Sequence, residues 1–171
     1  MASTGANVGA GGVTVANGRL YVSNGGYGLA VFDAAAGCGS VTCTPLWTAP
    51  GAYGLLAVTK TRVFAAGNIA EVGSPAPLSV FDAAGCGSSV CTALWSSHES
   101  RTYSAPVVAN GLVYATSQAG PTDVWRADGC SAGTCDAVAS LATNLSAPST
   151  TIVADGRLFV AGESLFTYTP S

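Results

Sequence analysis

The sequence carries very little charge. Only 9% of its 171 residues are charged, Lys60 is its one lysine, and the formal net charge is −3. It contains no cluster of basic residues of the kind that follows a phosphate backbone, which argues against a nucleic-acid partner. With so few charges, solubility depends on Ser, Thr, Asn and exposed backbone, as on a surface of strands and turns. Such a surface also tends to associate with neighbours.

Long apolar runs and helical patterns are also missing. No run approaches the roughly 18 residues of a membrane-spanning helix, so we expect no membrane span. No segment shows apolar residues at the helical period between two plausible caps. Residues 1–12 lack the positive and apolar regions of a signal peptide. We therefore expect either that a secretion signal has been removed or that the chain is a fragment.

What the sequence does contain is a fourfold repeat. Two short β-rich runs flank a two-residue turn in segments 13–25, 56–68, 106–118 and 151–163. Asn-Gly and Asp-Gly favour type I′ hairpins because both central residues need positive φ. Lys60-Thr61 fits that rule poorly, so a different turn is expected there. The four turns are Asn17-Gly18, Lys60-Thr61, Asn110-Gly111 and Asp155-Gly156.

A third strand and, in three units, a fourth strand follow each hairpin. The third strand centres on an aromatic residue, and a cysteine pair separates it from the fourth strand, which carries Trp47, Trp95 or Ala139. Units of four short antiparallel strands that repeat every ~43 to 50 residues predict an all-β fold of β-propeller blades. The expected blades cover about 13–50, 55–100, 105–146 and 150–171, and the last one is incomplete. The third-strand aromatics are Phe32, Phe81, Trp125 and Tyr168.

The incomplete last unit gives the N-terminal segment a possible task. Residues 1–12 stand where a preceding fourth strand would be, and propellers often close by completing one terminal blade with the other terminus. The segment can complete the fourth blade of its own chain or that of a neighbour. The chain can also be part of a larger ring.

The pattern VVANGxVY, followed by VFDAAxG and LW, resembles the quinoprotein-type (pyrroloquinoline-quinone-like) β-propeller repeat over residues 13–168. The resemblance implies that Trp47 and Trp95 dock onto neighbouring blades. The family includes cofactor-dependent dehydrogenases with about eight blades and a bound calcium, assembly scaffolds, and proteins without a known ligand. This chain has about half that number of blades and no acidic calcium cluster, so no cofactor is expected. Ala139 and Arg126 depart from the pattern, which marks the third unit as divergent.

The six cysteines fall into three pairs at a spacing of i and i+5, each around a turn. Such a loop places its two ends opposite each other at a separation that suits a disulfide, worth roughly 2 kcal/mol each. Zinc is the alternative, but His98 is the one histidine, and neither CxxC nor CxxCH occurs. We expect three disulfides and an oxidising compartment, extracellular or periplasmic. The pairs are Cys38/Cys43, Cys86/Cys91 and Cys130/Cys135.

Asp33 and Asp82 recur at the end of the third strand, before a glycine-containing turn. This position favours a carboxylate that accepts hydrogen bonds from the turn over a catalytic or calcium-binding one. Asn144-Leu145-Ser146 matches the acceptor pattern for N-glycosylation.

Non-repetitive loops on either side of the second unit are the best place for a ligand site. Segment 67–77 is the longest loop between second and third strands, and segment 96–104 is the densest polar cluster in the chain. A histidine beside a glutamate can perform acid–base work. However, adjacent residues tend to point apart, and no nucleophile or metal set accompanies them, so a solvated surface is the alternative. The candidate residues are Tyr53, Glu71, His98, Glu99, Arg101 and Tyr103.

Together these features predict an exported, disulfide-stapled β-propeller repeat protein without catalytic activity. Its expected role is that of an assembly subunit or interaction scaffold, whose partner is another copy or another extracellular protein. Strand complementation of the last blade would give closed rings or fibres. A glycan-binding module and a fragment of a quinone-dependent dehydrogenase are the alternative functions.

Overall fold

The computed structural model describes residues 11–24, 28–35, 43–67, 77–118, 120–143 and 149–169, and across these it contains strands and no helix. The all-β prediction is confirmed. The strands are β1 (Val13–Ala16), β2 (Arg19–Asn24), β3 (Gly28–Asp33), β4 (Trp47–Ala49), β5 (Tyr53–Val58), β6 (Arg62–Gly67), β7 (Pro77–Asp82), β8 (Trp95–Ser100), β9 (Val107–Ala109), β10 (Leu112–Thr116), β11 (Thr122–Arg126), β12 (Thr134–Cys135), β13 (Ala139–Leu141), β14 (Thr150–Ala154), β15 (Arg157–Ala161) and β16 (Leu165–Tyr168).

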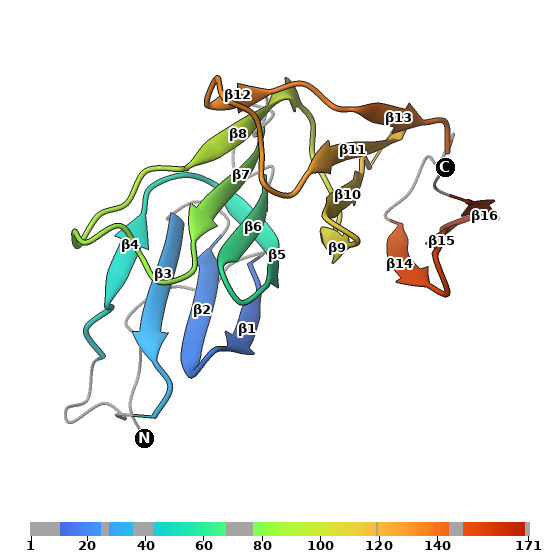
Figure 1. Cartoon of the computed structure of the whole chain (residues 1–171). Coiled ribbons are helices and arrows are strands. Elements are labelled where there is room, and N and C mark those ends of the chain that lie inside the picture. The colour runs from blue at the N-terminus through green and yellow to red at the C-terminus, as the bar shows by residue number, and fades with distance from the viewer. Residues whose placement is uncertain are drawn as a thin grey trace.

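The strands form four successive sheets. Their orders are β1-β2-β3-β4, β5-β6-β7-β8 with β12 added beside β8, β9-β10-β11-β13, and β14-β15-β16. Neighbouring strands are antiparallel except β12, which runs parallel to β8. The sheets fan out along an arc, with the first strand of each sheet on the inner side (Figure 1). Each sheet therefore faces the one before it and the one after it.

The backbone conformation of each hairpin turn depends on its two central residues. In three of them, φ lies between 48° and 52° at the first central residue and between 69° and 75° at the glycine. These left-handed values fit the predicted type I′ turns at Asn17-Gly18, Asn110-Gly111 and Asp155-Gly156. Lys60 and Thr61 do not adopt positive φ. The Thr59 hydroxyl closes that turn instead by accepting the backbone N–H of Arg62 at 3.1 Å.

The hydrophobic core lies between the sheets. Strand side chains alternate between two faces, so each sheet sends one apolar row toward each neighbour. Three clusters of buried residues result, one at each boundary between consecutive sheets. Their members include Leu29, Val31, Val63 and Phe81 at the first boundary; Phe64, Val80, Val113 and Trp125 at the second; and Tyr114, Val124, Leu158 and Val160 at the third.

Tryptophans on β4 and β8 pack into the first and second of these boundaries. Trp47 and Trp95 are both 3% exposed and join the cluster shared with the following sheet. Their indole rings lie over Gly85 and Gly129 of that sheet, where a Cβ atom would come within 2.8 Å and 2.5 Å of the indole Cδ1. Only glycine fits there. The docking that the repeat implied is confirmed at both positions.

The cysteine loops are stapled as expected. Cys86–Cys91 and Cys130–Cys135 form disulfides, each with a Cα–Cα distance of 5.6 Å. Cys43 is also disulfide-bonded, while Cys38 lies outside the described residues.

The 86–91 and 130–135 loops also cover the outer edge of the preceding sheet, which the sequence did not suggest. The Thr48 N–H of β4 donates to the Ser89 carbonyl at 2.8 Å, and the Cys91 N–H donates to the Thr48 carbonyl at 2.8 Å. At the next boundary, the Ser96 N–H of β8 donates to the Gly133 carbonyl at 2.9 Å. The loops therefore protect strand edges that would otherwise be free to pair with another chain.

Both ends of the arc differ from its middle. Among the described residues, the fourth sheet has three strands, and no stapled loop accompanies β16. At the other end, Gly12 pairs with β2 of its own sheet, accepting the Ser23 N–H at 2.9 Å. The rest of the proposed closing segment, residues 1–10, lies outside the described part, as does Asn144. Across the described residues, no helix is long and apolar enough to cross a membrane.

Candidate functional site

The predicted ligand residues do not form one patch. Tyr53 lies on β5 and His98 on β8, at opposite edges of the second group of four strands. The Tyr53 hydroxyl donates to the Pro50 carbonyl at 2.9 Å, its ring meets Phe81 edge-on at 5.6 Å, and burial raises its pKa. His98 pairs with Asp136 at 3.0 Å, and both side chains are exposed. Glu71 lies outside the described residues.

Glu99 joins the second unit to the third. One carboxylate oxygen accepts the Trp125 indole N–H at 3.1 Å, and the other accepts the Ala137 backbone N–H at 3.0 Å. Both donors belong to the following unit. The carboxylate that looked available for acid–base work therefore satisfies two polar groups at a boundary between sheets.

Arg101 and Tyr103 meet at a buried carboxylate that sequence reasoning missed. Asp123 on β11, whose side chain is 1% exposed, accepts the Tyr103 hydroxyl at 2.9 Å and the Ser140 hydroxyl at 2.6 Å. The Arg101 guanidinium lies 3.3 Å from it. Burial, and then the charge of Asp123, raise the pKa of Tyr103 well above its ordinary value. Asp123 occupies a repeat position that holds Ala30 and Ser79 elsewhere, which was the available signal.

The repeated aspartates act as turn acceptors. Asp33 accepts the Ala35 N–H and Asp82 accepts the Ala84 N–H, both at 2.8 Å. This confirms the turn interpretation of both residues. Within the described ranges, no three His, Cys, Asp or Glu side chains are grouped so that they could hold a metal ion.

The most unusual surface is on the fourth sheet. The front face of a sheet is the side turned toward the sheet that follows in the chain, and the back face is the side turned toward the preceding sheet. Ile152 and Leu165 on the front face of the fourth sheet are 54% and 66% exposed. Phe159 lies opposite Ile152 on the same face and is half-buried. These three residues form an apolar surface without a covering sheet among the described strands.

A groove marks the boundary between the third and fourth sheets. It has a volume of about 330 Å³, and Leu112, Tyr114, Ala139, Leu158 and Tyr168 are among its lining residues. Ala139 stands where Trp47 and Trp95 stand in the first two sheets. Because alanine cannot fill the space of an indole, this boundary lacks the docking contact that Trp47 and Trp95 make at the other two.

Comparisons with solved structures identify the fold. The computationally designed protein Ika4 gives a TM-score of 0.69 at 12% identity, covering 99% of this chain and 97% of that one. BamB from Moraxella catarrhalis gives 0.65 at 17% identity, and the designed protein Ika8 gives 0.64 at 10%. This chain is a β-propeller of antiparallel blades. Its four sheets are its blades.

The comparisons show the fold alone. No protein-family model matches the chain, and no curated protein matches it. Of the propeller structures, BamB and Ika8 are matched over 92% of this chain but over 41% and 44% of their own length, so the chain spans less than half of each. The resemblance to the quinoprotein-type repeat is supported at the level of the fold, by the similarity to BamB.

Proposed function

We propose that this chain is an exported, non-catalytic scaffold that assembles through its incomplete fourth blade. The observation that carries the proposal is the exposure of Ile152 and Leu165 on the front face of that blade. Apolar surface that stays uncovered in one blade, while its counterparts in the other blades are packed, is typical of an interaction site. The disulfides support export, because such bonds persist in oxidising compartments.

A structural use of the acidic groups supports the non-catalytic part. Among the predicted ligand residues and their partners, Glu99 accepts two hydrogen bonds from the third blade, and Asp123 accepts the hydroxyls of Tyr103 and Ser140. A catalytic acid or base must be able to reach a substrate proton. We therefore assign these groups to stability.

Strand complementation is a second part of the proposal. β16 is the last described strand of a three-stranded blade, and its outer edge has no paired strand there. An incoming strand could pair with its free backbone groups. The N-terminal segment of a neighbouring copy is the proposed donor.

Light scattering on the full chain over a range of concentrations tests the proposal. We expect a mass above that of one chain. Leu165→Asp should reduce it, because a buried unpaired carboxylate is costly. Leu94→Asp, at another exposed leucine (48% exposed), is the matched control and should not reduce the mass.

Deleting residues 2–12 should abolish the strand-dependent assembly. Quinone-dependent activity on addition of the quinone with calcium would contradict the non-catalytic part.

A further inference from the structure

The repeat shows what the front face of the fourth blade is built to contact. Tyr21, Phe64 and Tyr114 occupy one repeat position on the front faces of the first three blades, and all three are buried. Phe159 holds this position in the fourth blade and is half-buried. At a second position, Leu29, Leu78 and Thr122 are at most 1% exposed, whereas Leu165 is 66% exposed. The difference is that each of the first three blades is followed by another described blade, whereas none of the described strands covers the front face of the fourth.

The first blade has the complementary face. On the back faces of the second to fourth blades, Val58, Val108 and Val153 share one position and are partly covered by the preceding blade. Val15 holds that position in the first blade and is 67% exposed; Val13, on the same face, is 59% exposed. Val22 and Phe32, farther along this face, are already buried. The open apolar part is therefore confined to β1 and the adjoining Leu20.

We infer that the front face of the fourth blade binds the back face of the first blade of a second copy, so that copies associate head to tail. This inference rests on the proposed scaffold function and names its partner. The contact repeats, between chains, the front-to-back contact that each blade makes with the next one inside the chain. Ile152, Phe159 and Leu165 would meet Val13, Val15 and Leu20 of the second copy.

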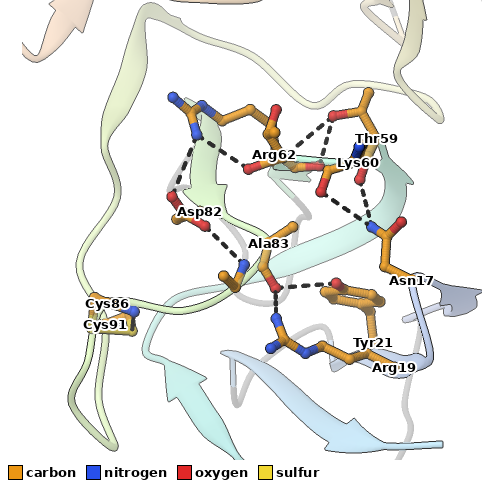
Figure 2. Close-up of polar contacts among 12 residues, drawn as sticks. Asn17, Arg19, Tyr21, Thr59, Lys60, Arg62, Asp82, Ala83, Cys86 and Cys91 are labelled. Atoms are coloured by element: carbon orange, nitrogen blue, oxygen red, sulfur yellow. Dashed lines mark hydrogen bonds and ion pairs between the residues drawn. A yellow bond between two sulfur atoms is a disulfide. The ribbon is translucent and has the colours of Figure 1, made fainter.

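The boundary between the first two blades shows how the polar groups would meet (Figure 2). There the Arg19 guanidinium and the Tyr21 hydroxyl both donate to the Ala83 carbonyl of the following blade, the latter at 3.2 Å. Arg157 occupies the position of Arg19 in the fourth blade and is exposed. Ala34 occupies the position of Ala83 in the first blade. We expect the Arg157 guanidinium to bind the Ala34 carbonyl of the second copy, which would fix the register of the contact.

Two observations favour a second copy over the first blade of the same chain. The first and fourth blades lie at opposite ends of the arc of described strands (Figure 1), and the third core cluster joins the fourth blade to the third. In addition, the match covers 41% of the BamB chain and 44% of the Ika8 chain, so each of these chains is somewhat more than two copies long. Because the contact is head to tail, it closes into a ring if the rotation completes a circle and extends into a fibre if it does not.

Two blocked variants test the inference. The front variant carries Ile152→Asp and Leu165→Asp, and the back variant carries Val13→Asp and Val15→Asp. Each should have the mass of a single chain, 16.8 kDa. An equimolar mixture should give a dimer of twice that mass, because the intact back face of one variant can bind the intact front face of the other. Native mass spectrometry with one variant isotopically labelled would show that the dimer contains one of each.

Several results would overturn the inference. A back variant that still forms dimers by itself would indicate a contact between two fourth blades. A mixture that stays monomeric, or a wild-type chain that is monomeric at every soluble concentration, would exclude the head-to-tail contact. Assembly that survives both sets of substitutions would contradict this contact and leave strand complementation at β16 as the mode of assembly.

Controls keep a folding defect from being mistaken for lost binding. Far-ultraviolet circular dichroism and the intact disulfide mass should match those of the wild type. If an aspartate variant fails this check, Val13→Thr with Val15→Thr and Ile152→Thr with Leu165→Thr replace it, because threonine is a β-branched residue of the kind that strands favour. Leu94→Asp should leave assembly unchanged.

Discussion

At the scale of single residues, one departure from the repeat removes the docking tryptophan from one boundary. Ala139 takes the place of the docking tryptophan, and the groove of about 330 Å³ lies beside it. Ala139→Trp should fill part of this space and raise the free energy of unfolding by about 0.5–2 kcal/mol, as cavity-filling changes commonly do. Urea denaturation would measure it. Ser140→Trp, on the same strand but directed to the other face, is the control and should not stabilise; equal gains from both would exclude filling of the groove.

We expect Tyr103 to contribute to the loss of stability at alkaline pH. Burial and the Asp123 carboxylate raise its pKa, so the folded chain keeps a proton that the unfolded chain loses near pH 10. Above that pH the unfolded state binds fewer protons, and the free energy of unfolding falls. Tyr103→Phe should make this fall shallower, although it costs about 1–2 kcal/mol at pH 7 through the lost hydrogen bond.

Urea denaturation at pH 7 and pH 11 measures the effect. Ser140→Ala is the matched control, because it removes another hydrogen bond to Asp123 at 2.6 Å without removing a titrating group. It should lower stability at both pH values and keep the alkaline fall. An unchanged pH dependence in Tyr103→Phe would rule out this residue as a source.

At the scale of elements, the stapled loop has two tasks, which can be separated. Replacing Cys86 and Cys91 by serine should cost about 2 kcal/mol, because the closed loop is short. It should also loosen the loop from β4, so that the Thr48 amide, which donates to Ser89 at 2.8 Å, exchanges faster with solvent. Hydrogen exchange would show this. The same change at Cys130 and Cys135 should instead speed the exchange of the Ser96 amide. Equal acceleration of the Thr48 and Ser96 amides in either variant would contradict a local role.

The same elements show how far the sequence could predict the structure. The repeat made several features predictable, because the same local residues recur in successive units. These features are the turns, the strand order, the disulfides and the tryptophan docking. The covering of β4 by the 86–91 loop was missed because it joins backbone groups of two different units and needs no particular side chain. The Asp123 cluster was missed because it occurs once, and its partners Arg101 and Ser140 come from separate segments.

At the scale of the whole molecule, stability in a repeat protein is close to a sum of each unit and its contacts with neighbours. The second and third blades have two such contacts, whereas the fourth has one, and that one lacks a docking tryptophan. We therefore expect β14 to β16 to open first. At low protein concentration, their amides should exchange faster than those of β6 and β10, the second strands of the middle blades.

The dependence of this exchange on protein concentration tests whether a second copy covers the fourth blade. If a second copy covers the front face of the fourth blade, its amides should become protected as the concentration rises, because binding stabilises the folded state by mass action. Those of β6 should not change. The front variant, with Ile152→Asp and Leu165→Asp, should show fast exchange in β15 at every concentration. Slow exchange throughout the fourth blade of the dilute wild type would mean that this blade is stable without a partner, and the link between its bare face and assembly would be lost.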